Sequence, residues 1–321
     1  MSKVIKPFLL CTLLGISFSD YFIPEFKNFD QNDRVIVTAK SNPSTLQNPA
    51  SSVSASLDVL DDPTTKTEYQ RLMQSIGDRV SQLPMDEVLQ TVSSQFLGKP
   101  YREGLLDRGE IEKLSVSLTE FDCVLFVETV LAFTRNLLAT KPTYANFIDQ
   151  VQTVRYTNGN LDGYCSRLHY FSAWIRDNQK RNIVRDLTAE LGGIRLEKRL
   201  NFMSSNWQKY PRLKHSESNY QCILAMEEKL ELETKSAPLR YIPSPNIHAI
   251  YSSLKAGDII AVVTDIKGLD TTHTGFVYPT AKGFGFIHAS LSGKVKVSPD
   301  LQRYVERVDH AIGIMVARPQ P

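Results

Sequence analysis

Apolar residues recur every three or four positions from about residue 67, which is the spacing of amphipathic helices. Two such stretches come first, and Gly98 and Pro100 then predict a turn. The next stretch, SLTEFDCVLFVETVLAFTRNLL at 117–138, is apolar almost throughout. This pattern predicts two helices, a turn, and then a helix that contains Cys123.

The pattern changes after residue 250 to short runs rich in β-branched and aromatic residues. These runs are GDIIAVVT, HTGFVYPT, FGFIHAS, KVKVS and AIGIMVARP, separated by Gly, Pro, Lys and Asp. The middle of the chain, roughly 140–250, mixes short helices with loops and shows no repeat of fixed period. Helices first and an antiparallel sheet last predict an α+β domain.

The N-terminal segment has two lysines, an apolar run and small residues ending at Ser19, which is typical of a secretory signal peptide over 1–19. The apolar run is too short to span a bilayer comfortably. Residues 20–66 are rich in Ser, Thr, Asn, Asp and Pro and predict a polar tether, which leaves 67–318 as the folded domain. We therefore expect a secreted, periplasmic protein without a membrane span.

The composition is that of a globular protein, with 42% hydrophobic and 22% charged residues among 321 and a net charge of +2. Lysines and arginines are scattered and form no basic stripe interleaved with aromatic residues. We therefore expect no nucleic-acid partner, and we expect a monomer.

Four cysteines are present, and Cys11 lies in the predicted signal peptide, behind Leu10 instead of the small residue of a lipoprotein site. Cys123, Cys165 and Cys222 remain, and an odd number in an oxidising compartment leaves at least one thiol unpaired. One interpretation is a Cys165–Cys222 disulfide or three buried thiols. The other is that Cys123 is retained for chemistry.

Asp122 is a favoured N-cap residue, so Cys123 should lie in the first turn of that helix. The helix dipole and the unpaired backbone N–H groups there favour the thiolate, which is the nucleophilic form. A buried cysteine is, however, also a common small hydrophobic core residue. A reactive Cys123 would need a base.

His273 and His288 are the best candidates among six histidines, because they lie on two adjacent predicted strands. A hairpin centred between Thr280 and Ala281 would place them opposite one another, with Cβ atoms about 5 Å apart. Phe286, with Phe284, would share a face with His288. If this aromatic wall packs on the cysteine helix, a nucleophile, a base and an orienting residue meet. Each histidine alone could equally be an ordinary strand residue.

The motifs FLGKPYREGLLD, FDCVLFVETV, LKAGDIIAVV, THTGFVY and FIHAS resemble those of NlpC-type papain-like cell-wall hydrolases. The longer segments FDCVLFVE, RYTNGNLDGYCSRLHYFSAWIRDN, NFMSS, GLDTTHTGF and IHAS resemble the N-acetylmuramoyl-L-alanine amidase-like family within that superfamily. The resemblance covers about 67–318. It implies a papain-like fold in which the helical half with the cysteine packs on the sheet with the histidines.

The resemblance also implies an amidase that cleaves the bond between the lactyl group of N-acetylmuramic acid and L-alanine, with peptidoglycan or muropeptides as partners and no cofactor. Cys123 would be the nucleophile, His273 the general base and acid, and His288 the orienting residue. Tyr101, in GKPY, matches a tyrosine that lines the substrate site, although a core aromatic after a turn is an equally good interpretation.

A long insertion separates the cysteine from the histidines and should build additional walls for the substrate. Within it, SRLHYFSAWIRD places Tyr170 and Trp174 four residues apart, framed by Arg167 and His169. Aromatic rings beside polar groups suit sugar stacking and carboxylate recognition, so these four residues are candidate substrate contacts. An aromatic pair at this helical spacing can instead simply pack.

Three other functions remain open at this point. A D,L-endopeptidase would cut within the stem peptide on the same fold, and a non-catalytic cell-wall binding module would lack turnover. A zinc site made of Cys123, His273 and His288 is chemically feasible, but the sequence lacks the paired short spacings that usually mark one. The substrate could be the polymeric sacculus or released muropeptides, including anhydro forms.

Overall fold

The structure is a computed structural model that describes residues 59–61, 63–80 and 82–321. The predicted signal peptide, Cys11 and residues 20–58 of the predicted tether lie outside the described residues. Within the last part of that tether, β1 (Val59–Asp61) forms a strand and α1 begins at Pro63. Regular structure therefore begins before residue 67.

The first half is helical, as the spacing of apolar residues predicts. It contains α1 (Pro63–Val80), α2 (Met85–Gln95), α3 (Cys123–Leu137) and α4 (Tyr144–Arg155), and β1 pairs in parallel with β2 (Leu114–Val116). Every residue of α3 except Arg135 is buried, because α2, α4 and the sheet surround it. The predicted helix that begins at Cys123 is confirmed.

The C-terminal half forms an antiparallel sheet from the five predicted strands. These are β6 (Ile259–Thr264), β7 (Thr271–Thr280), β8 (Gly283–Ser290), β9 (Lys294–Ser298) and β10 (Ala311–Pro319). The insertion extends the sheet past β10 with β3 (Val184–Asp186), β4 (Ile194–Arg195) and β5 (Arg240–Pro243). The α+β prediction is confirmed.

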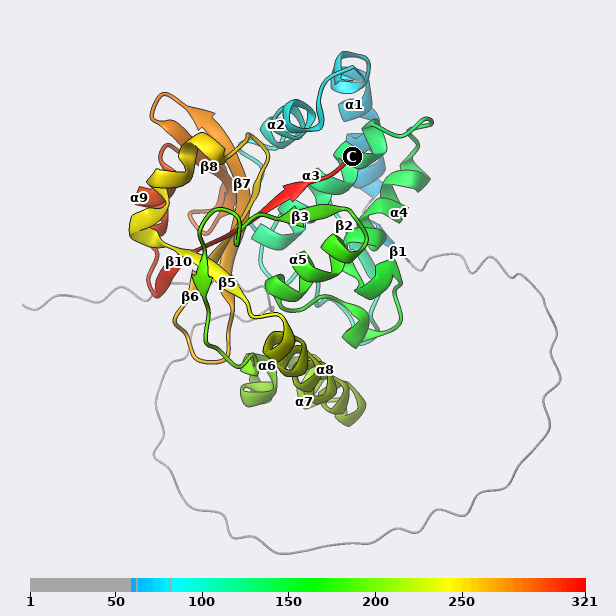
Figure 1. Cartoon of the computed structure of the whole chain (residues 1–321). Helices are drawn as coiled ribbons and strands as arrows, with labels where there is room; N and C mark the ends of the chain where they lie inside the picture. The colour runs from blue at the N-terminus through cyan, green and yellow to red at the C-terminus, as the bar shows by residue number, and fades with distance from the viewer. Residues whose placement is uncertain (1–58, 62, 81) are drawn as a thin grey trace, which may run out of the picture.

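Both faces of this sheet are covered, and α3 lies on one side while α9 (Leu301–Val305) lies on the other (Figure 1). On the α3 face, the rings of Phe126 and Phe276 meet with centroids 5.8 Å apart. On the α9 face, Phe286 packs against Tyr304 with centroids 5.0 Å apart. The sheet is thus the middle layer of the molecule.

The insertion contains α5 (Phe171–Lys180), α6 (Phe202–Ser205), α7 (Pro211–Lys214) and α8 (Glu217–Ser236). Short 3-10 turns lie at Thr157–Gly159, Tyr164–Ser166, Trp207–Lys209, Ser244–Asn246 and His248–Ser253. α6, α7 and α8 lie together at one end of the molecule (Figure 1).

The 20-residue length of α8 was not expected, because the sequence there predicts only short helices. Its buried residues are only Ile223, Glu227 and Leu230, so the helix presents little apolar periodicity to recognise. A disulfide between Cys165 and Cys222 joins α8 to the turn before α5. The structure thereby selects the disulfide from the alternatives left open by the sequence.

Candidate active site

Cys123 is the first residue of α3, and its neighbour Asp122 caps the helix by accepting a 2.7 Å hydrogen bond from the backbone N–H of Leu125. Both side chains are buried. Burial raises the pKa of Asp122 to about 7 in spite of this hydrogen bond. The position at a helix N-terminus is the one that stabilises a thiolate.

Tyr101 lies beside this N-terminus. It forms an isolated bridge with Phe121, and its backbone N–H donates to the Gly293 carbonyl at 2.9 Å. Burial, followed by the charges of Asp122 and Glu103, raises the pKa of the Tyr101 phenol. The structure therefore places Tyr101 within electrostatic reach of the residue preceding Cys123, as a residue lining the candidate site should be.

The structure brings His273 on β7 and His288 on β8 into direct contact, with Nε2 of His273 and Nδ1 of His288 2.6 Å apart. The predicted register is wrong, however. Thr280 pairs with Gly283 and Phe276 with Ile287, so the hairpin turn lies one residue later than expected. This shift moves the register by two residues, which keeps both histidines on one face and makes them diagonal neighbours.

The two histidines lie where β7 and β8 separate. Pairing between these strands ends at Phe276 and Ile287, while β7 continues along β6 and β8 continues along β9. Gly275 lies at this fork, and a Cβ there would come within 2.8 Å of His288 Cβ and 2.5 Å of the Ile287 carbonyl oxygen. The glycine thus provides the space that His288 occupies.

The remaining nitrogens of the pair differ in their surroundings. Nε2 of His288 lies 3.2 Å from the Ser298 hydroxyl, whereas Nδ1 of His273 has no hydrogen-bond partner among the described residues. Burial lowers the pKa of His273 to about 3, and burial together with His273 lowers the pKa of His288 well below its ordinary value. Both imidazoles are therefore neutral near pH 7, and when Nε2 of His273 donates to Nδ1 of His288, Nδ1 of His273 is the nitrogen that can accept a proton.

Aromatic rings cover the pair on the α9 side. Phe286 stacks on His288 at 4.8 Å, and the ring of Tyr304 lies 4.7 Å from His288. Neither Ser298 nor Tyr304 was singled out in the sequence. The register alone could have indicated Ser298, which pairs with Phe286, whereas nothing in the sequence around Tyr304 distinguishes it from a core aromatic.

The aromatic wall does not pack on the cysteine helix, so the condition considered in the sequence analysis is not met. Phe284 packs on Tyr251 and Phe286 on Tyr304, both on the face away from α3. The α3 helix covers the alternate residues of the same strands, through Phe276. The sheet is apolar on both faces, so alternation in the sequence does not reveal which face the helix covers.

The helix and the base nevertheless lie on adjacent elements. Phe126, one turn after Cys123, contacts Phe276, three residues after His273. The first turns of α3 therefore pack on β7 close to the point where β7 and β8 separate.

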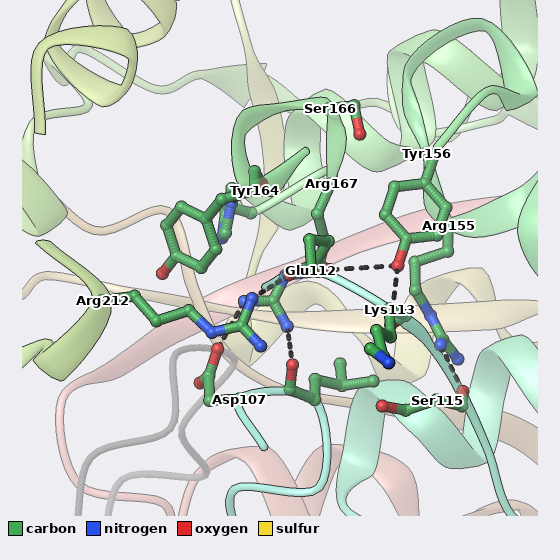
Figure 2. Close-up of polar contacts among 12 residues, drawn as sticks. Asp107, Glu112, Lys113, Ser115, Arg155, Tyr156, Tyr164, Ser166, Arg167 and Arg212 are labelled. Atoms are coloured by element: carbon green, nitrogen blue, oxygen red, sulfur yellow. Dashed lines mark hydrogen bonds and ion pairs between the residues drawn. The ribbon is translucent and has the colours of Figure 1, made fainter. Parts of the chain in front are cut away.

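The candidate substrate contacts Arg167 and His169 are both buried. Figure 2 shows Arg167 within a network of polar residues. Arg167 donates to the carbonyl of Leu106 at 2.7 Å and pairs with Asp107. His169 Nε2 lies 2.9 Å from the Tyr164 carbonyl oxygen, and burial lowers its pKa to about 3. Burial alone would raise the pKa of Asp107, but Arg167 holds it below its ordinary value.

A second buried pair in this region joins Glu128 of α3 to Arg155 of α4, with Nε 2.6 Å from Oε2. Arg155 also donates to the Ser115 carbonyl at 2.5 Å. Burial raises the pKa of Glu128 in spite of this partner. The pair connects two helices and β2, which is a structural role.

Tyr170 and Trp174 are fully buried, and the structure gives both packing roles instead of surfaces for a sugar. The Tyr170 hydroxyl donates to Glu227 at 2.7 Å and accepts from the backbone of Met203 at 3.1 Å. Trp174 stacks on Phe171 with centroids 4.9 Å apart. Their spacing in the sequence reflects core packing, so we do not carry them forward as substrate contacts.

The described part of the chain contains no group of three or more His, Cys, Asp or Glu residues arranged to hold a metal ion. Among its helices, none combines the length and apolarity needed to cross a membrane.

Comparisons with known proteins give a consistent family signal. A model described as AmiA-like, N-acetylmuramoyl-L-alanine amidase-like, matches residues 91–314. The chain is similar to the structure of an N-acetylmuramoyl-L-alanine amidase from Bacteroides uniformis, with 30% identity over 74% of this chain and 99% of that one and a TM-score of 0.67. No curated protein matches the chain.

Two further structures share the fold. A Bacteroides fragilis protein with a provisional xylanase name is 31% identical over 71% of this chain and 99% of that one, with a TM-score of 0.64. A Legionella pneumophila protein is 20% identical over 80% of this chain and 95% of that one, with a TM-score of 0.60, and supports the fold alone.

Proposed function

The chain belongs to the N-acetylmuramoyl-L-alanine amidase-like family, and from this premise we propose that it is a cysteine hydrolase of papain-like fold. Its substrate is the amide between the lactyl group of N-acetylmuramic acid and L-alanine, in peptidoglycan or its soluble fragments. The enzyme is exported to the periplasm by the N-terminal segment.

The observation that carries the proposal is the histidine pair. His288 holds one nitrogen of His273 at 2.6 Å, which leaves Nδ1 of His273 to accept a proton. A nucleophile, a base and an orienting residue are the parts that acyl transfer requires. Ser298 fixes His288 in turn.

In the proposed reaction, Cys123 approaches Nδ1 of His273 through the opening between β7 and β8. The thiol proton moves to Nδ1 and the thiolate sulfur attacks the lactyl carbonyl carbon. A thiolate beside the ring raises the pKa of His273 again, because an opposite charge favours the imidazolium.

Collapse of the tetrahedral intermediate breaks the C–N bond, and the imidazolium gives its proton to the departing amine of L-alanine. A thioester remains on Cys123. Water then attacks this thioester, with His273 taking one proton from it and returning it to the sulfur. The products are the free lactyl carboxylic acid of the sugar and the peptide.

The test is mass analysis of the products from an N-acetylmuramoyl-tripeptide. The amidase releases intact N-acetylmuramic acid and a tripeptide with a free L-alanine amine, and it leaves the free tripeptide uncut. If the sugar product instead retains L-alanine and D-glutamate, the enzyme is a D,L-endopeptidase. Absence of any turnover would favour a binding module.

Three variants assign the roles, with His215→Ala as a control in an exposed histidine. Cys123→Ser should abolish turnover and leave the fold intact. His273→Ala should lose nearly all activity, and His288→Ala should lose less, because removal of the orienting residue degrades geometry but leaves the base. Wild-type rates for Cys123→Ser would refute the nucleophile, and unchanged rates for His273→Ala would require a different base.

A further inference from the structure

The loop 102–113 joins Tyr101 to β2 and borders the candidate active site. The backbone N–H of Arg102 donates to the carbonyl of Phe121 at 2.9 Å, two residues before Cys123. The start of this loop therefore lies next to the N-terminus of α3.

Two arginines of this loop share one carboxylate. Nε of Arg102 lies 2.5 Å from Oε2 of Glu120, and Nη2 of Arg108 lies 3.0 Å from Oε1 of the same residue. The cluster keeps a net positive charge, since two guanidinium groups face one carboxylate. Within the described residues, the remaining nitrogens of the two guanidinium groups make no hydrogen bond in addition to these.

Both arginine side chains remain open to solvent, 61% exposed for Arg102 and 57% for Arg108. An exposed ion pair contributes little to stability, about 0–1 kcal/mol. A guanidinium group with unused N–H donors is, however, well suited to bind a second carboxylate through two parallel hydrogen bonds. The cluster of Arg102, Arg108 and Glu120 therefore adds little to the stability of the fold and is better explained as a binding surface.

Arginines of the insertion hold this loop in place (Figure 2). Arg167 binds Leu106 and Asp107, as described above. The buried Arg212 of α7 donates to the carbonyls of Arg108 at 2.9 Å and Gly109 at 3.2 Å, and it pairs with Glu112. A loop fixed in this way pays less conformational entropy when it binds a ligand.

We propose that Arg102 and Arg108 form a carboxylate-binding subsite that recognises the acidic stem peptide of the substrate, with Arg167 and Arg212 as the residues that position it. This inference rests on the proposed function and adds a determinant of specificity to it. A stem peptide that continues from L-alanine to D-glutamate carries a carboxylate close to the scissile bond, on the side of the leaving group.

The test compares two substrates, N-acetylmuramoyl-L-alanyl-D-glutamate and its diamide, in which both carboxylates are amides. We expect the wild-type enzyme to prefer the acid by about tenfold in kcat/KM, mainly through KM, which is the size of one charge-assisted hydrogen bond. Arg102→Gln/Arg108→Gln should reduce this ratio to about one, because kcat/KM for the acid falls to that for the diamide. Arg185→Gln, which removes another exposed arginine paired with Glu190, should keep the full preference.

Binding to Cys123→Ala, measured by calorimetry with the same two compounds, separates the subsite from the chemistry. The Kd ratio between acid and diamide should be about tenfold and should again depend on the two arginines. If Arg102→Gln/Arg108→Gln keeps the preference for the acid over the diamide in both kcat/KM and Kd, the subsite proposal is wrong while the amidase function stands. If the wild-type protein hydrolyses neither compound but the arginines still govern the Kd ratio, the subsite stands and the proposed function fails.

Discussion

Gly275→Ala tests whether the contact between His273 and His288 is part of the machinery, without removing a polar group. The added Cβ would lie 2.5 Å from the carbonyl oxygen of Ile287 and 2.8 Å from His288 Cβ. These separations are too short for non-bonded atoms, so the β8 backbone and His288 must move. Overpacking of this kind costs about 1–3 kcal/mol in the free energy of unfolding.

The effect on catalysis should be larger than the effect on stability. Displacement of His288 lengthens the 2.6 Å contact with His273 and releases the ring that orients the base. A misplacement of about 1 Å costs roughly a hundredfold in rate when geometry controls the reaction. We therefore expect kcat/KM on the muramoyl-tripeptide to fall about 10- to 100-fold for Gly275→Ala at a temperature where it is folded.

Gly313→Ala is the matched control. Its Cβ would collide with the carbonyl oxygen of Ile242 on β5, in the same sheet but on strands that carry neither histidine. Both variants should lose stability in thermal denaturation, but only Gly275→Ala should lose activity and change the imidazole nitrogen shifts in NMR. If Gly275→Ala and Gly313→Ala both keep the kcat/KM of the wild-type enzyme, the histidine pair is structural and the assignment of the base is wrong.

Three further predictions concern the stability of the fold. Cys165→Ser/Cys222→Ser should lower the free energy of unfolding by about 4 kcal/mol in the chain-entropy account, since the disulfide closes a loop of 57 residues; an unchanged Tm would contradict this account. Glu128→Ala leaves the Arg155 charge buried and unpaired, so the free energy of unfolding measured with urea should fall by about 3–5 kcal/mol. Glu128→Leu/Arg155→Met removes both charges and should restore most of this stability. Stability should also fall as the pH drops from 6.5 to 5, because the unfolded chain protonates His169, His273 and His288, which burial keeps neutral in the fold, and these three groups outweigh the opposite effect of Asp122. At lower pH the fall should level off, because burial also raises the pKa of Glu128 and Asp270. A flat urea midpoint between pH 7 and pH 5 would refute this prediction.

The regular elements nearest the candidate site could be predicted from the sequence because their patterns are strong. The 117–138 segment is mostly apolar and carries a good N-cap, so the start of α3 at Cys123 is determined locally. The strands β6 to β10 are short β-rich runs bounded by turn residues. In each case the local signal and the tertiary environment agree.

For the histidine hairpin, the sequence correctly predicted that both histidines lie on one face of the sheet but did not predict the pairing register. Gly283 adopts a φ of 95°, which a glycine tolerates and other residues rarely adopt, and this moves the turn one residue beyond its expected centre. Parity along a strand survives a shift of two residues, so His273 and His288 still meet. The fork between β7 and β8, by contrast, depends on which edges of the two strands find partners, and the sequence does not indicate that.

The roles within the insertion were harder to infer because burial changes what a residue can do. Arg167 and His169 resemble ligand-binding residues in the sequence, yet both are buried with protein partners. Arg102 and Arg108 are unremarkable in the sequence but exposed beside the candidate site. Their position is visible only once the fold shows that the loop returns to Phe121.

The same physical argument connects the fork to the way the site could work. Each strand keeps one partner at the fork, β7 with β6 and β8 with β9, so only the two edges that face each other lose their ladder hydrogen bonds. Aromatic rings cover the two imidazoles on the α9 side, and burial keeps both neutral. A nearby thiolate favours protonation of an imidazole that is otherwise neutral. Such a base is suited to deliver a proton to a leaving amine, because the ring holds the proton only while the anion is present. The opening in the sheet thus places the proposed base where its charge is controlled by the nucleophile instead of by solvent.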